Sequence, residues 1–122
     1  MIVVKTSLKE FPGRGIGLVS ESPIKKGQVV YRFNPIIDII INKKDIPKEA
    51  KEFYDTYAVE IGKEKLMLNT DNARFINHSK KPNTKSLGKM KENIAIKDIK
   101  KGEEITIDYE AIEKAPLNFK PK

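Results

Sequence analysis

The sequence Arg74-Phe75-Ile76-Asn77-His78-Ser79-Lys80-Lys81-Pro82-Asn83 decides most of what can be inferred about the fold. In it an apolar pair is followed at once by a run of polar side chains, of which Asn77, His78 and Ser79 can donate or accept hydrogen bonds. Such a segment suits a ligand that offers amino or carboxylate groups. It is equally typical of a strand end that closes in a turn capped by its own side chains. The residues alone leave both interpretations open.

Two further segments, one on each side of this stretch, contain residues suited to a binding site. Gly13-Arg14-Gly15-Ile16-Gly17 lacks a Cβ atom at its three glycines, so its backbone can lie close against a ligand. A tight connection between two strands would also explain it. Lys101–Tyr109 opens with a glycine turn and alternates like a strand that ends in Asp108-Tyr109. A tyrosine at a strand end can present its hydroxyl to a pocket, although a core or rim position is the commoner role.

Length and composition bound the chain to one domain and exclude several kinds of site. Its 122 residues form a single predicted domain, 1–122, with a net charge of 24 − 17 = +7. The chain has no cysteine and one histidine, His78, which excludes disulfides, a thiolate nucleophile and Cys-ligated or multi-histidine metal sites. We therefore expect no metal. The longest apolar run, Ile36–Ile41, contains Asp38 and is far shorter than a membrane span. We expect a cytoplasmic protein, or a nuclear one if it acts on chromatin.

Lysine supplies most of the positive charge, since only Arg14, Arg32 and Arg74 are arginines. Proteins that read nucleic acids usually favour arginine for bidentate contacts with bases and phosphates. Because the lysines are spread along the whole sequence, they predict a solvated surface, and we do not expect nucleic acid as a direct ligand. A protein partner with acidic patches stays open.

Short apolar segments separated by turn residues predict a mostly β chain built of small sheets. The one predicted helix begins at Asp45 and ends at Gly62, because apolar residues recur there every three or four positions. Residues 80–91 predict a surface loop or hairpin, and the tail 111–122 is expected to be irregular. The predicted strands cover residues 2–8, 18–20, 28–33, 36–41, 66–68, 94–96 and 104–109.

Taken in this order, the three segments resemble those of the SET domain, the fold of protein lysine methyltransferases. Gly15-Ile16-Gly17 is similar to the family's Gly-x-Gly motif, and Arg74–Asn83 is similar to its Arg-Phe-Ile-Asn-His-Ser-x-x-Pro-Asn motif. Gly102–Tyr109 resembles its Gly-Glu-Glu-Leu-Thr-x-Asp-Tyr motif. The resemblance covers about residues 2–110. It implies a mostly β fold of the β-clip type, with several small β-sheets around a pseudoknot and one helix. The third segment would pass through a loop near the second.

The resemblance also implies a chemistry: S-adenosyl-L-methionine as cofactor and a lysine of a protein substrate as methyl acceptor. Tyr109 would be the catalytic residue, and the lysine would enter a narrow channel, with Tyr31 and Phe119 as candidate channel residues. Asp108 is expected to be structural, and Glu104 to be a surface or buttressing group. The cofactor-binding residues implied by the resemblance are Gly15, Ile16, Gly17, Arg74, Asn77, His78 and Tyr109.

The sequence departs from the family pattern at positions that bear on the pocket. Lys80 follows Asn-His-Ser where a cysteine is frequent, and no cysteine is present to build the zinc-binding extension that completes the pocket in many members. Leu117 or Phe119, or a second subunit, would then have to cover the cofactor. A homodimer therefore stays open.

Two functions from different classes follow from these residues. The first is an S-adenosylmethionine-dependent protein-lysine N-methyltransferase. The alternative is a non-catalytic module of the same fold that binds protein or nucleic acid through its lysine-rich surface. Asn77, His78 and Tyr109 favour the enzyme, because a non-catalytic module has no physical need of that set. The net positive charge favours a neutral or acidic protein substrate over basic histone tails.

Overall fold

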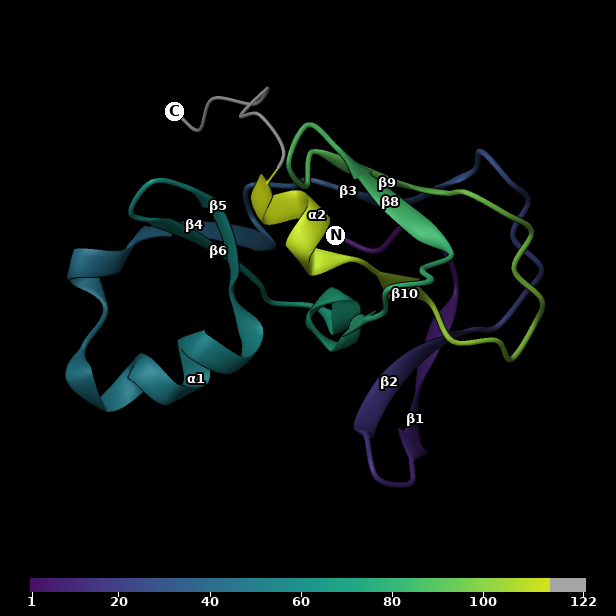
Figure 1. Ribbon diagram of the computed structural model, residues 1–122, viewed down its shortest axis with the longest axis horizontal. Helices are drawn as coiled ribbons and strands as arrows, with labels where there is room; N and C mark the ends of the chain where they lie inside the picture. The colour runs from purple at the N-terminus through teal and green to yellow at the C-terminus, as the bar shows by residue number, and fades with distance from the viewer. Residues whose placement is uncertain (115–122) are drawn as a thin grey trace.

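Four small β-sheets hold most of the regular secondary structure of the protein, of which a computed structural model describes residues 1–114 (Figure 1). The two-stranded sheets pair β1 (Thr6–Phe11) with β2 (Gly15–Ser20), and β7 (Asn77–His78) with β10 (Thr106–Ile107). One three-stranded sheet has the order β3-β9-β8, formed by β3 (Val29–Arg32), β8 (Thr84–Leu87) and β9 (Glu92–Ala95). The other has the order β4-β6-β5, formed by β4 (Asp38–Asn42), β5 (Val59–Gly62) and β6 (Lys65–Asn69). The predicted mostly β class is confirmed.

The helices differ from the prediction in length and in place. The predicted helix over Asp45–Gly62 was too long, because only α1 (Lys51–Tyr57) is α-helical there. Ile61 fitted the predicted helical stripe, being three and four residues from Ala58 and Tyr57, but it lies on β5, where Val59 and Ile61 are buried with the two-residue period of a strand. A second helix, α2 (Tyr109–Lys114), begins at the last residue of the strand predicted over 104–109 and continues into the tail expected to be irregular. The remaining short turns are 3₁₀ helices: η1 (Lys43–Asp45), η2 (Lys48–Ala50) and η3 (Asn72–Phe75). Within residues 1–114, no helix has the length and apolar character to cross a membrane.

The run Ile36–Ile41 was predicted to be a buried strand, and this is wrong at its start. The chain turns at residues 34–37, so β4 begins only at Asp38, and the side chain of Ile36 is 82% exposed. Asp38 is the buried residue instead. Its Oδ1 accepts a hydrogen bond from Asn69 Nδ2 (2.9 Å), and its Oδ2 accepts one from the backbone N–H of Asn34 (2.8 Å). These bonds satisfy a carboxylate that burial would otherwise destabilise.

Substituting Asp38 is therefore expected to cost far more stability than substituting Ile36. Asp38→Ala removes the shared acceptor of three donors, the Asn69 amide, the Asn34 N–H and the N-terminal ammonium group (2.6 Å), and should lower the free energy of unfolding by about 3 kcal/mol. Ile36→Ala removes only exposed surface and should change it by less than about 0.5 kcal/mol. Urea denaturation of both variants measures the difference. Equal losses would show that Ile36 packs against the fold in solution.

One apolar core lies where the sheets meet, and it includes the strands that carry the two longest motifs. Its side chains come from β2, β3, β5, β6, β9 and β10 as well as from η3 and α2. The buried apolar residues are Leu18, Ile24, Val30, Tyr31, Val59, Ile61, Met67, Ala73, Ile76, Met90, Ala95, Ile99, Ile105, Ile107 and Ile112. Ile76 and Ile105, which directly precede the short β7 and β10 strands, are thus fixed by burial.

The parallel pairing of β7 with β10 determines where the functional segments meet. Thr106 lies opposite Asn77, and Ile107 lies opposite His78, as the resemblance implied for these two segments. Asn83 fastens the pairing, because its Oδ1 accepts from the Thr106 N–H (2.9 Å) and its Nδ2 donates to the Glu104 carbonyl (2.7 Å). Every other paired set of strands in residues 1–114 is antiparallel.

Candidate active site

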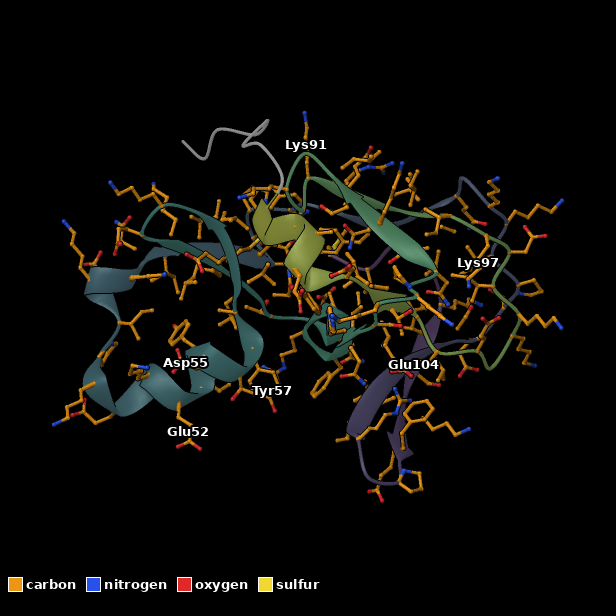
Figure 2. The ribbon with its side chains drawn as sticks, viewed as in Figure 1. Glu52, Asp55, Tyr57, Lys91, Lys97 and Glu104 are labelled. Carbon is orange, nitrogen blue, oxygen red and sulfur yellow. The ribbon has the colours of Figure 1, made fainter. Side chains whose placement is uncertain are left out.

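A cleft of about 680 Å³ opens between the β1–β2 hairpin and the C-terminal end of α1. In Figure 2, Asp55 and Tyr57 are labelled on the α1 side and Glu104 lies beside the hairpin. The volume is in the range of small-molecule sites. The lining residues are Arg14, Gly15, Ile16, Asp55, Thr56, Tyr57, Ala58, Val59, Arg74, Phe75, Ile76, Asn77, His78 and Tyr109. Six of the seven predicted cofactor-binding residues lie among them; Gly17 does not.

Asn77 is held in one orientation by two acceptors. Its Nδ2 donates to the Ile16 carbonyl (3.1 Å) and to Glu104 Oε2 (2.8 Å), which uses both amide hydrogens. Its Oδ1 accepts no hydrogen bond from residues 1–114. The side chain therefore offers the cleft an acceptor and no donor, so it suits a ligand amine rather than a carboxylate.

Gly17 lies behind this arrangement and leaves it room. A Cβ atom at this position would lie 2.5 Å from Glu104 Oε2, 2.8 Å from Phe11 Cε2 and 3.0 Å from Asn77 Nδ2. The absence of a side chain is thus what lets the carboxylate and the amide approach the β2 backbone. Gly17 supports the cleft without lining it.

Glu104 joins the hairpin to the motif segment. Its Oε1 lies 2.6 Å from Arg14 Nη2, and its Oε2 receives the Asn77 amide. The Glu104 side chain is only 11% exposed, whereas Arg14 is half exposed and lies over the Phe11 ring at 4.6 Å. The sequence pattern treated Glu104 as a surface or buttressing group. The structure shows the buttressing contacts, which connect β1–β2 to Asn77.

Glu104→Ala is expected to lower the free energy of unfolding by about 1–2 kcal/mol, mainly through the Asn77 amide, which loses a nearly buried acceptor. The half-exposed Arg14 contributes little to this loss because solvent screens it. Glu92→Ala is a matched control, since the Glu92–Arg32 pair (3.0 Å) is more exposed on both sides. It should cost less than about 1 kcal/mol. Chemical denaturation of both variants checks the order, which a larger loss for Glu92→Ala would contradict.

Tyr109 begins α2 and turns its ring into the fold. Its hydroxyl donates to the Ile76 carbonyl (2.6 Å), and its backbone N–H donates to His78 Nδ1 (3.2 Å). Burial raises the pKa of the Tyr109 hydroxyl well above its usual value, so the hydroxyl is neutral at physiological pH. Asp108 Oδ1 accepts from the Ala111 N–H (3.2 Å), which caps the first turn of α2. Tyr109 is thus held in place at two points, by a hydrogen bond of its backbone N–H and by one of its side-chain hydroxyl.

An arginine surrounded by aromatic rings forms another wall of the cleft. The Arg74 guanidinium lies 5.1 Å from the Phe75 ring centroid, 5.3 Å from that of Tyr57 and 6.0 Å from that of Phe53. Its Nε is buried and has no hydrogen-bond partner within residues 1–114. The sequence pattern had assigned Tyr57 to the apolar stripe of the helix, and no local signal distinguished it as a cleft residue.

Of the two candidate channel residues, the structure describes only Tyr31, which does not line this cleft. Tyr31 is fully buried in the core, where its hydroxyl accepts from Asn69 Nδ2 (3.1 Å) and donates to Met67 Sδ (3.7 Å). Phe119 lies outside the described residues. A search of residues 1–114 finds no group of three or more histidine, cysteine, aspartate or glutamate side chains that could hold a metal ion.

Comparison with known families supplies the assignment. The family model of the SET domain matches residues 15–110, which is most of the chain. The chain belongs to the SET-domain family. The match includes every cleft residue except Arg14, and the resemblance seen in the motifs is confirmed.

Solved structures support the SET fold independently. A candidate histone methyltransferase from Plasmodium falciparum superposes with a TM-score of 0.64 at 24% identity, over 88% of this chain and 95% of that one. A humanized mutant of the Chaetomium thermophilum Polycomb Repressive Complex 2, bound to the inhibitor GSK126, superposes with a TM-score of 0.62 at 21% identity. It matches over 88% of this chain and 15% of that one. At these identities the likeness concerns the SET fold alone. No curated protein matches the sequence.

Proposed function

We propose that the protein is an S-adenosylmethionine-dependent protein-lysine N-methyltransferase. The observation that carries the proposal is the meeting of Asn77 and Tyr109 at one cleft through the β7–β10 pairing. Both residues match the motifs of the family to which the chain belongs. A purely structural role would not explain an amide that presents a free acceptor beside a buried tyrosine.

The residues present fit the proposed cofactor. The cleft is large enough for a nucleoside with an amino-acid side chain, and Asn77 Oδ1 is the acceptor that an α-amino group needs. Arg74 offers a cation and an unpartnered buried Nε, which suits the carboxylate of an amino acid. Gly15 and Ile16 would contribute the backbone wall opposite α1, and His78 the other side. When bound, S-adenosylmethionine supplies a methyl group activated on a sulfonium.

Tyr109 would act as a positioned acceptor and not as a base. Its hydroxyl hydrogen is committed to the Ile76 carbonyl, so the lone pairs of its oxygen are free for weak CH···O or N–H contacts. Its raised pKa keeps the hydroxyl protonated. A target lysine, with a pKa near 10.4 in water, is neutral in only about one molecule in a thousand at pH 7.4. Desolvation of its amine in a closed channel would favour the neutral, nucleophilic form, and alignment of the reacting groups would supply much of the rate.

Calorimetric titration with S-adenosylmethionine, and with its demethylated product, tests the proposal. The parent protein should bind both with micromolar affinity, and Asn77→Ala should abolish binding by removing the acceptor. Asn72→Ala is the matched control, because Asn72 is exposed on η3 and does not line the cleft. Absence of binding by the folded parent protein at millimolar cofactor would overturn the proposal.

A further inference from the structure

Two turns on the side of the molecule away from α1 have nearly the same sequence and share a side-chain hydrogen bond that closes the turn. Ile24-Lys25-Lys26-Gly27-Gln28 and Ile99-Lys100-Lys101-Gly102-Glu103 differ only at their last residue. In the first turn Lys25 N–H donates to Gln28 Oε1 (3.1 Å), and in the second Lys100 N–H donates to Glu103 Oε1 (2.9 Å). The glycines have φ of 90° and 85°, a region in which residues with a Cβ are strained. Both turns are therefore fixed in one shape.

The two turns are also fastened to each other. Ile24 and Ile99 exchange two backbone hydrogen bonds of 2.8 Å, and Asp98 Oδ1 accepts from the Lys26 N–H (2.9 Å). Figure 1 shows these two segments side by side at the end of the molecule opposite α1. Lysines that lie more than 70 positions apart in the sequence are thus brought together.

We define the lysine ridge as Lys25, Lys26, Lys97, Lys100 and Lys101, all of which are exposed. None of them forms an ion pair within residues 1–114. The nearby carboxylates of Asp98 and Glu103 accept from backbone N–H groups instead, so they hold the turns in shape. The segments have a net charge of 5 − 2 = +3. Lysines on the opposite end are paired, as in Lys43–Glu60 (3.0 Å) and Lys51–Asp55 (2.7 Å).

The surroundings of the ridge distinguish between kinds of polyanion. Protein interfaces bury an apolar centre, whereas nucleic-acid interfaces are polar and strongly positive. The large exposed apolar side chains among residues 1–114 are Val3, Leu8, Ile16, Ile36, Ile39, Phe53 and Leu87, and none lies in the two turns. The ridge therefore lacks the centre that an acidic protein partner would need.

We propose that the lysine ridge binds the phosphate backbone of double-stranded DNA without sequence preference. Lysine contacts phosphate as a point charge, and the absence of arginine from the ridge leaves no bidentate reader of base edges. The even spread of lysines along the sequence argued against a nucleic-acid ligand. In the fold the lysines are not evenly spread, because two rigid turns bring together five lysines that form no ion pair within residues 1–114. If the proposed methyltransferase function holds, DNA attachment would bring the cleft to proteins bound to the same polymer.

Fluorescence anisotropy with a labelled 20-base-pair duplex of arbitrary sequence tests the ridge, and no cofactor is needed. The ridge variant is Lys26→Gln, Lys100→Gln, Lys101→Gln, and the control is Lys44→Gln, Lys48→Gln, Lys63→Gln. Both variants have a net charge of 7 − 3 = +4, so only the position of the charge differs. Circular dichroism verifies that both remain folded.

The ridge variant should bind at least about tenfold more weakly at 100 mM salt and should lose about 2.7 units of the slope of log K against log salt. The control should stay within about twofold of the parent. Equal losses of DNA affinity in both variants would show that only the net charge matters and would overturn the proposal. Absence of DNA binding by the parent protein would overturn it as well. Equally tight binding of polyglutamate would assign the ridge to acidic polypeptides instead. Cofactor titration reports separately on the cleft, so either proposal can fail alone.

Discussion

Tyr109→Phe is expected to lower the rate of methyl transfer at least about a hundredfold, while S-adenosylmethionine affinity changes only a few-fold. The substitution keeps the ring in its place and removes one oxygen. Because that oxygen donates its hydrogen to the Ile76 carbonyl, its lone pairs stay available as acceptors. A lost hydrogen-bonding group that acts chiefly in the transition state lowers kcat by about 10²–10³. Loss of the bond to Ile76 should cost only about 1 kcal/mol of stability.

Single-turnover transfer of a radiolabelled methyl group onto a panel of lysine-containing proteins measures the effect. The panel includes core histones, acidic proteins and the protein itself, so that the substrate need not be known in advance. Tyr54→Phe is the matched control, since Tyr54 lies on α1 and does not line the cleft. It should transfer methyl groups at the parent rate. A Tyr109→Phe variant that did the same would remove Tyr109 from the reaction.

Gly17→Ala is expected to weaken cofactor binding at least about tenfold, which is about 1.4 kcal/mol. The new methyl group would lie 2.5 Å from Glu104 Oε2, 2.8 Å from Phe11 Cε2 and 3.0 Å from Asn77 Nδ2, so these side chains must move. Movement of Asn77 displaces the one acceptor that we assign to the cofactor amine. Because all three contacts are with side chains and not with backbone, the fold should lose only about 1–3 kcal/mol, in the range of other overpacked sites.

Calorimetric titration and urea denaturation of the same Gly17→Ala sample separate these two effects. Gly13→Ala is the control, because a Cβ there meets nothing within 4 Å and the backbone φ of 79° adds only local strain. That strain should cost about 1 kcal/mol and leave cofactor affinity unchanged. Unchanged affinity in Gly17→Ala would mean that the Glu104–Asn77 contact does not position the amide.

The cleft residues that the sequence predicted all belong to recognisable motifs. Asn77, His78 and Tyr109 stand in long motifs, and the order of those motifs identifies the family. Tyr57 and Asp55 line the same cleft from α1, and nothing in their local sequence distinguishes them from helix residues. Their role follows from where α1 is placed, which is set by long-range packing of β5 and β6.

Burial was predicted less well where a polar residue stands inside an apolar run. The isoleucine-rich run Ile36–Ile41 predicted that Ile36 and Ile39 are buried. In the structure both are exposed, and Asp38 is buried. The buried position of Asp38 depends on Asn69, which lies on β6 and pairs with it only in the folded chain. A sequence window cannot contain such a partner. The length of α1 was overestimated for a similar reason, since β6 draws Val59–Gly62 into a sheet.

The link between Arg14 and Glu104 joins residues 90 positions apart, and β10 completes the cleft only by returning to β7. A chain emerging from the ribosome can therefore form the β1–β2 hairpin early, but it cannot assemble the cleft until almost the whole domain has been synthesised. Contacts of such large sequence separation also slow folding, because loop closure comes before any gain from packing. Affinity for the cofactor should accordingly appear last during refolding, which makes it a sensitive reporter of complete folding. Ligand present during synthesis would then stabilise only finished molecules and could not guide their early steps.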